Sequence, residues 1–210
     1  MKRLRAGALV LLCVAFLSWA PGEACGEGVV VALGDSLTAG PGVAADEAFP
    51  ARLEARLRAE GYAYRVVNAG VSGDTTAGGL RRVDWALRAS PDVVIVALGA
   101  NDGLRGQSPQ ATRANLEEIV ARLQAAGARV LVAGMRLPPN YGAEYTKEFE
   151  AVFPAVARRA KVALMPFLLN GVAGDPRLNQ ADGIHPSAAG HQVIADHLWP
   201  YLRPLLRPVK

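Results

Sequence analysis

The sequence predicts an α/β protein: a three-layer α/β/α sandwich built on a parallel sheet. Short runs rich in Val, Ile, Leu and Ala alternate along the chain with longer segments whose apolar residues recur at helical spacing. The connecting helices are long enough for right-handed crossovers, which join parallel strands and cover both faces of their sheet. Because 51% of the 210 residues are apolar and 20% are charged, the chain is able to bury a substantial core.

Five short segments have the composition of strands. The first, at residues 29–33, is a β-branched run that stops at Gly34-Asp35-Ser36, where a tight turn presents a hydroxyl group. Residues 93–98 form the clearest buried strand, an unbroken run of Val, Ile, Ala and Leu. We expect strands at residues 29–33, 64–68, 93–98, 129–133 and 162–164.

Five helical segments alternate with these strands. Asp46 is the expected N-cap of the first helix, and Ser108 followed by proline is a strong start signal for the third. Pro154 falls inside the fourth helix and predicts a kink, and Pro200 and Pro204 are expected to break the last helix near its end. We expect helices at residues 46–61, 75–89, 109–126, 143–160 and from 187 onward.

The first residues carry the pattern of a secretory signal. A basic start is followed by an uncharged run at residues 6–19 and by small residues up to Ala24. We therefore expect residues 1–24 to be a signal peptide and residues 28–205 to form the mature domain, exported to the periplasm. Two alternatives stay open: lipid attachment at Cys25, and a retained anchor, which is disfavoured because the run is shorter than the roughly 20 residues that span a bilayer.

Composition excludes several classes of function. The formal net charge is +4, and the basic residues beyond the N-terminus are scattered, so we expect no nucleic-acid partner. Cys13 lies in the expected signal and Cys25 is the only other cysteine, which excludes an intramolecular disulfide and cysteine-based metal binding in the mature chain. We expect a monomer without a stable membrane span and without a metal site.

Polar residues and a glycine follow the predicted strands in a recurring position. Ser36, Gly70 and Asn101 come after the first three strands, and Asp182 and His185 share a later loop. Because parallel strands end at one edge of their sheet, these residues can converge there. Each segment by itself also fits an ordinary turn or a helix-capping loop. Their occurrence together, in this order, favours a catalytic site.

Ser36 requires a base, since a serine hydroxyl is a weak nucleophile until a neighbour takes its proton. His191 and His197 lie on the terminal helix, where packing or surface roles are usual, and His185 lies in a loop. Asp182 precedes His185 by three residues, so one tight turn can bring its carboxylate to the imidazole Nδ1. We therefore expect Ser36 as the nucleophile, His185 as the base and Asp182 as the residue that orients the base.

Acyl transfer also requires fixed donors for the charge that develops on the carbonyl oxygen. The backbone N–H groups of Ser36 and Gly70 and the side-chain amide of Asn101 would supply three of them. Glycine suits this position because its backbone can approach a substrate closely. We expect these three residues to form an oxyanion hole.

Apolar residues in loops beside this site are candidates for substrate binding. Leu104, Leu137, Pro138 and Tyr141 could line a groove for an acyl chain. Packing within the loops would explain the same residues, and the sequence leaves both interpretations open.

Four sequence blocks together resemble the SGNH (GDSL) hydrolase superfamily, over residues 28–205. They are Gly34-Asp35-Ser36-Leu37, the segment 68–73 with Gly70, Gly99-Ala100-Asn101-Asp102 and Asp182-Gly183-Ile184-His185-Pro186. Residues 34–40 and 135–142 are further similar to the bacterial secreted group of acyl-CoA thioesterase I, arylesterase and lysophospholipase. The α/β-hydrolase fold fits less well, because its Gly-x-Ser-x-Gly elbow needs a glycine where Thr38 stands.

The resemblance implies a five-stranded, flavodoxin-like sheet in the order 2-1-3-4-5, which the residue pattern alone leaves open. It implies the same roles for Ser36, Asp182 and His185, and places Gly70 and Asn101 in the oxyanion hole with Ser36. It also implies an esterase without metal or organic cofactor, active on aryl esters, acyl thioesters and lysophospholipids. The alternatives are a secreted carbohydrate acetylesterase of the same fold and a non-catalytic secreted binding module.

Overall fold

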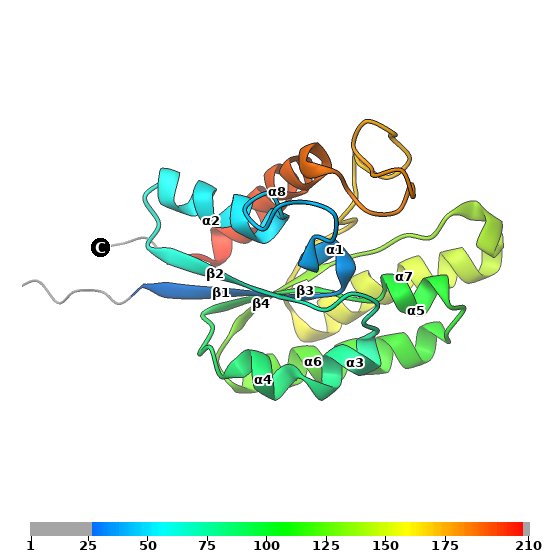
Figure 1. The fold of residues 1–210 in the computed structure, drawn as a ribbon. Helices are drawn as coiled ribbons and strands as arrows, with labels where there is room; N and C mark the ends of the chain where they lie inside the picture. Colours follow the sequence, from blue (N-terminus) through cyan, green and yellow to red (C-terminus); the bar gives the residue numbers. More distant parts are fainter. Residues whose placement is uncertain (1–26, 208–210) are drawn as a thin grey trace, which may run out of the picture.

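A parallel sheet of five strands forms the middle layer of the fold (Figure 1). The computed structural model describes residues 27–207. Its strands lie in the order β2-β1-β3-β4-β5, so the fold class expected from the sequence and the strand order implied by the resemblance are confirmed. The strands are β1 (Gly28–Gly34), β2 (Tyr64–Gly70), β3 (Val93–Ala97), β4 (Arg129–Ala133) and β5 (Ala163–Met165).

Helices cover both faces of the sheet and complete the three layers (Figure 1). One face is covered by α2 (Phe49–Ala59) and α8 (Ala188–Leu202). The opposite face is covered by α3 (Thr76–Arg81), α4 (Val83–Leu87), α6 (Pro109–Ala125) and α7 (Ala143–Ala160). Two short helices, α1 (Ser36–Ala39) and α5 (Ala100–Leu104), come directly after β1 and β3. Short 3₁₀ turns at Pro139–Tyr141 and Arg203–Leu205 complete the described elements.

The central strands β1 and β3 carry the core. Every residue of β3, and residues 29–33 of β1, are at most 7% exposed. Because helices cover both faces of the sheet, neither face of these strands is exposed to solvent. Their sequences are therefore continuous apolar runs and do not alternate between polar and apolar residues. The largest fully buried side chains include Phe49 from α2, and Phe149 and Phe153 from α7 on the opposite face.

The predicted signal peptide at residues 1–24 and the lipid-attachment alternative at Cys25 lie outside the described residues. Within residues 27–207, no helix combines the length and the apolar character that a membrane crossing requires.

Helix α2 begins later than the sequence predicts. Its N-cap is Ala48, which makes no side-chain cap hydrogen bond, and Pro50 lies in the first turn. Because proline fixes φ at a helical value and has no N–H to leave unsatisfied, it starts a helix well without a polar cap. The prediction of Asp46 as the cap is therefore wrong.

The helix expected over residues 75–89 is in fact two helices, α3 and α4, which meet at Arg82. Thr75 caps α3 and accepts a hydrogen bond from the N–H of Gly78. Arg82 interrupts the helical path with φ −112° and ψ 13°. At this break the Arg82 side chain donates hydrogen bonds to the carbonyl oxygens of Ala69 and Gly34, contacts that no local pattern predicts.

The last helix continues past the expected break. Pro200 lies inside α8, which ends at Leu202, and Pro204 lies in the following 3₁₀ turn. Pro200 occupies the final turn, where the missing N–H costs one hydrogen bond and the chain needs only two more helical residues. The predicted break is therefore wrong for Pro200, and the helix ends two residues later, just before Pro204.

Ser108 caps α6 as predicted, and its Oγ accepts a hydrogen bond from the N–H of Ala111 at 3.3 Å. Replacing Ser108 by alanine is expected to lower the free energy of unfolding by about 1 kcal/mol, because one orphan N–H of the first turn loses its acceptor. Urea denaturation measures the change, with turnover of the variant as the control. Equal midpoints for the variant and the wild type would contradict the assignment of this cap.

Candidate active site

Ser36 stands at the first position of α1, two residues after the end of β1. The turn is tight because Gly34 has no side chain: a Cβ there would overlap the side chain of Thr38 and the carbonyl oxygen of Ala97. Asp35 caps α1 by accepting a hydrogen bond from the N–H of Leu37 at 3.0 Å. The Ser36 side chain is thereby held at the carboxyl edge of the sheet.

His185 and Asp182 complete a relay with Ser36. Ser36 Oγ lies 3.0 Å from His185 Nε2, and His185 Nδ1 lies 2.7 Å from Asp182 Oδ2. Because an ionised carboxylate only accepts hydrogen bonds, Nδ1 carries the proton and Nε2 is left to accept from the serine. The structure therefore brings the three residues together across 149 positions of sequence.

Asp182 also organises its own loop. Its Oδ1 accepts hydrogen bonds from the N–H groups of His185, at 3.0 Å, and of Ile184, at 2.9 Å. Hydrogen bonds from the His185 backbone and ring and from the Ile184 backbone hold the pKa of this carboxyl well below its usual range. Asp182 is therefore ionised wherever the imidazole can act as a base.

The other two histidines have structural contacts. His191 in α8 is buried, and its Nδ1 accepts a hydrogen bond from the N–H of Phe49 at 3.3 Å. Burial lowers the pKa of His191 to about 4, which keeps its ring neutral. The Nδ1 of His197 lies 2.9 Å from the carbonyl oxygen of Asn170. His185 is thus the histidine that faces Ser36.

Asn101 in α5 reaches the turn that follows β2. Its Nδ2 donates a hydrogen bond to the carbonyl oxygen of Asp74 at 2.9 Å and lies 3.5 Å from Asp35 Oδ2. One of its two amide protons is thereby fixed, so the group has a defined orientation beside the Ser36 turn. The N–H of Ser36 is the first of α1 and has no acceptor within the helix.

Gly70 has contacts that the sequence does not reveal. It ends β2, and its N–H donates a hydrogen bond to Asn68 Oδ1 at 3.0 Å. A Cβ at this position would overlap the backbone of Ala39 and Thr38, so the glycine permits α1 to pack against the end of β2. Its N–H is therefore already engaged, and its role as an oxyanion donor stays a prediction.

Gly73 lies three residues further along the same turn. Its φ is +77°, a value that favours glycine, and among residues 27–207 its N–H donates to no other group of the chain. It precedes Asp74, whose carbonyl oxygen accepts from Asn101. Gly73 is thus a second candidate for the backbone donor that the sequence assigns to Gly70.

The predicted substrate residues lie beside α5. Tyr141 Oη donates a hydrogen bond to the carbonyl oxygen of Leu104 at 3.2 Å, and a Cβ at Gly103 would overlap Leu137. Leu104 is 38% exposed, Pro138 is exposed, and Leu137 and Tyr141 are half-buried. The structure brings these loops together, and an acyl-binding role for them stays a prediction.

Comparison with known proteins decides the family. A family model described as the GDSL-like lipase/acylhydrolase family matches residues 32–193. The chain belongs to this family. Esterase TesA of Pseudomonas aeruginosa is 46% identical over 178 residues, which cover 84% of this chain and 89% of that protein. Thioesterase 1/protease 1/lysophospholipase L1 of Escherichia coli strain K12 is 40% identical over 185 residues, 88% of each protein. The crystal structure of TesA aligns with a TM-score of 0.82 at 46% identity, covering 85% of this chain and 99% of that one.

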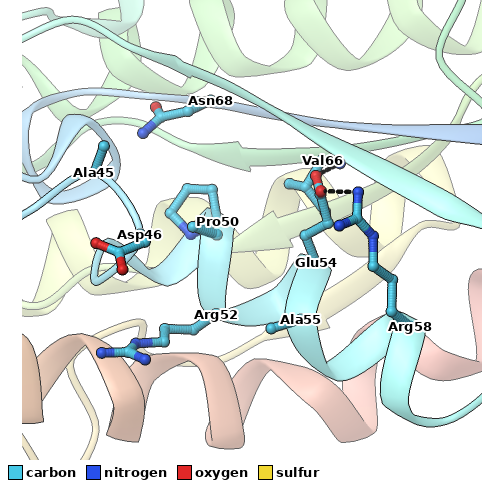
Figure 2. A pocket seen from close by; sticks show the side chains of 10 residues that line it. Ala45, Asp46, Pro50, Arg52, Glu54, Ala55, Arg58, Val66 and Asn68 are labelled. Atoms are coloured by element: carbon cyan, nitrogen blue, oxygen red, sulfur yellow. Dashed lines mark hydrogen bonds and ion pairs between the residues drawn. The ribbon is translucent and has the colours of Figure 1, made fainter.

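One hollow of this GDSL-like hydrolase is lined by none of the predicted site residues. It has a volume of about 530 Å³ and opens between α2 and the edge strand β2, with Asp46, Arg52 and Asn68 among its lining residues (Figure 2). Glu54, also in its lining, accepts a hydrogen bond from the N–H of Val66 and pairs with Arg58 (Figure 2). Its lining is largely polar and does not suit an acyl chain.

Among the described residues, no group of three or more His, Cys, Asp or Glu side chains is placed to hold a metal ion.

In this family member, two side chains connect the segments of the site by hydrogen bonds, and the sequence predicts neither of these roles. Gln180 Nε2 donates to the carbonyl oxygen of Pro186 at 3.0 Å and to that of Pro41 at 2.7 Å, so it joins the His185 loop to the segment after α1. Arg82 contacts the ends of β1 and β2. Both act through tertiary hydrogen bonds, for which neither periodicity nor spacing provides a signal.

Asp35 is fully buried beside the nucleophile. Burial raises its pKa to about 7; the hydrogen bond from Leu37 opposes this shift, and the charges of Asp74 and Asp102 add to it. Between about pH 4 and pH 7 the folded chain therefore holds a proton at Asp35 that the unfolded chain has released. The stability that Asp35 contributes is present below pH 4 and is lost as the pH rises through 7.

Replacing Asp35 by asparagine is expected to remove this pH dependence. The amide is neutral at every pH, so the free energy of unfolding of the variant, relative to wild type, should rise as the pH increases from about 5 to about 8. Urea denaturation of both proteins at these two values measures the change, and the contribution of His191 cancels because both proteins contain it. A difference that does not vary with pH would contradict the raised pKa.

Proposed function

We propose that this chain is an esterase that cleaves carboxylic esters and thioesters through an acyl-enzyme on Ser36. The observation that carries the proposal is the relay from Ser36 Oγ to His185 Nε2 at 3.0 Å and from His185 Nδ1 to Asp182 at 2.7 Å. The relay joins a weak nucleophile to a base and fixes the tautomer of that base.

The reaction has two steps. Ser36 Oγ bonds to the carbonyl carbon while its proton moves to His185 Nε2, and the imidazolium is stabilised by Asp182. The carbon–oxygen or carbon–sulfur bond of the substrate then breaks, and His185 returns the proton to the leaving alcohol or thiol. Water next gives a proton to His185 and attacks the acyl-enzyme, which releases the acid and restores Ser36.

The N–H of Ser36 and the Nδ2 of Asn101 are the proposed donors to the developing oxyanion. A third donor comes from the turn after β2: Gly70 is the residue predicted from the sequence, and the unengaged N–H of Gly73 supports Gly73 instead. Replacing Asn101 by alanine is expected to lower kcat by about 10²–10³-fold, because one preorganised donor is lost in the transition state.

Steady-state kinetics on a p-nitrophenyl ester measure the Asn101→Ala effect. The exposed Asn170 supplies a matched Asn→Ala control, which is expected to retain wild-type kcat. If Asn101→Ala retained kcat within threefold of wild type, Asn101 would not be an oxyanion donor.

We propose aryl esters, acyl thioesters and lysophospholipids as substrates, with the acyl chain beside Leu104, Leu137, Pro138 and Tyr141. The names of the relatives, an esterase and a thioesterase/lysophospholipase, support this range. Hydrolysis of p-nitrophenyl esters of increasing chain length tests the groove, with rates expected to hold or rise beyond acetyl. A sharp optimum at acetyl would favour a carbohydrate acetylesterase instead.

The decisive test of the proposed chemistry is covalent labelling with a fluorophosphonate. The probe is expected to modify Ser36 stoichiometrically, as located by peptide mass spectrometry, and to leave the Ser36→Ala variant unlabelled. A folded wild-type chain that resists the probe and hydrolyses no ester would favour a non-catalytic binding module.

We also propose export of the chain to the periplasm through residues 1–24, and action there as a monomer on small-molecule esters. The basic start and the uncharged run of the first residues support this location.

A further inference from the structure

The Arg82 guanidinium makes three hydrogen bonds, and each goes to a different segment. Nη2 donates to the carbonyl oxygen of Gly34 at 2.6 Å, and Nη1 donates to that of Ala69 at 2.7 Å. Nε donates to Asp74 Oδ2 at 2.6 Å. The guanidinium therefore joins the carboxyl ends of β1 and β2 to the turn that follows β2.

These three acceptors adjoin the reacting groups. Gly34 is two residues before Ser36, and Ala69 directly precedes Gly70. Asp74 directly follows Gly73, and its carbonyl oxygen holds the amide of Asn101. Every segment that carries a proposed oxyanion donor is thus tied to one side chain, either directly or through Asp74.

The ion pair between Arg82 and Asp74 is largely shielded from solvent. The side chains of Arg82 and Asp74 are 18% and 11% exposed, so their ion pair is screened far less than a surface pair. A planar guanidinium presents several donors in a fixed fork, which a flexible lysine ammonium does not reproduce. The break between α3 and α4 at Arg82 releases this residue from the helical path at the position where it reaches both strands.

We propose that Arg82 is a positioning residue that sets the distance between the Ser36 turn and the oxyanion donors of the turn after β2. The proposal rests on the proposed esterase function. If Arg82 acted only on stability, its loss would reduce the number of folded molecules and leave each folded molecule fully active. If it positions the donors, each folded molecule should turn over more slowly, because transition-state contacts are sensitive to displacements of about 1 Å.

The test compares Arg82→Lys and Arg82→Ala with Arg81→Ala, a control at the exposed neighbouring arginine. Competent sites are counted by exhaustive fluorophosphonate labelling of Ser36, and kcat is expressed per labelled site on a p-nitrophenyl ester. Both Arg82 variants are expected to lose about 10²-fold in kcat per site, with KM nearly unchanged, because the lost contacts act in the transition state. Arg81→Ala is expected to match wild type. Added guanidinium ion should raise the kcat of Arg82→Ala in a saturable way and leave Arg81→Ala unaffected.

Wild-type kcat per labelled site in Arg82→Lys, or a loss of activity that only tracks the number of labelled sites, would overturn the proposal. If Arg82→Ala does not fold, Arg82→Lys decides alone, since it keeps the cation beside Asp74. Failure of the proposed function gives a different result: the wild type itself would then not be labelled at Ser36.

Discussion

Replacing Ser36 by alanine is expected to lower kcat by about 10⁴–10⁶-fold, the largest effect of any single change in this chain. The alanine removes the atom that would bond to the substrate, and the oxyanion donors alone sustain only a small residual rate. The fold should be unaffected, because the hydrogen bonds of the turn are made by backbone groups and by the Asp35 carboxyl group and not by the serine hydroxyl. The rate of p-nitrophenyl ester hydrolysis and the unfolding midpoint measure the two parts of this expectation.

Ser108→Ala is the matched control for this change. It removes a hydroxyl from the start of another helix, costs stability and should leave kcat unchanged. Activity of Ser36→Ala within tenfold of wild type would exclude Ser36 as the nucleophile, whatever the stability of the variant.

Replacing Asp182 by asparagine is expected to lower kcat by about 10³–10⁴-fold. The N–H groups of His185 and Ile184 both point at Oδ1, so the amide oxygen of asparagine must take that position. Its NH₂ group then faces His185 Nδ1 and can only donate, which moves the ring proton to Nε2. A protonated Nε2 cannot accept the proton of Ser36.

Steady-state kinetics and fluorophosphonate labelling rates measure the effect of Asp182→Asn. Asp175 provides a matched control, since it is another loop aspartate whose Oδ1 accepts a backbone hydrogen bond, from Arg177, and has no contact with the relay. Asp175→Asn is expected to retain wild-type kcat. Comparable rates for Asp182→Asn and wild type would contradict the role of Asp182 in fixing the tautomer.

The elements with strong local signals are predictable from the sequence. The bounds of β4 and α7 coincide with the expected residues, and Ser108 caps α6, because a buried strand and a Ser-Pro start are determined by a few adjacent residues. Asp46 fails as a cap since Pro50 starts α2 without one. A polar cap signal is thus reliable where the proline follows it directly, as at Ser108, and fails where the proline lies four residues further along, as after Asp46.

The reacting residues of the candidate site are predictable from the sequence, but the side chains that hold them in place are not. Ser36, His185 and Asp182 were identifiable because their chemistry limits the residue types that can serve. The contacts of Arg82 with Gly34 and of Gln180 with Pro41 join segments far apart in sequence. Nothing in the local pattern encodes such pairs. The hydrogen bonds that hold the site together are therefore known only from the structure, and the order of the strands only from the resemblance and the structure.

The distance of 149 residues between Ser36 and His185 makes hydrolysis a reporter of complete folding. Ser36 follows the first strand, whereas the His185 loop directly precedes α8, which packs with α2 on one face of the sheet. Joining such distant segments closes the longest loop in the site and carries a high entropic cost. A growing or partly refolded chain in which α8 is not yet packed has the nucleophile, but its base is not yet held beside it. In refolding experiments, the recovery of esterase activity should therefore coincide with the last tertiary event, and not with the earlier formation of the sheet.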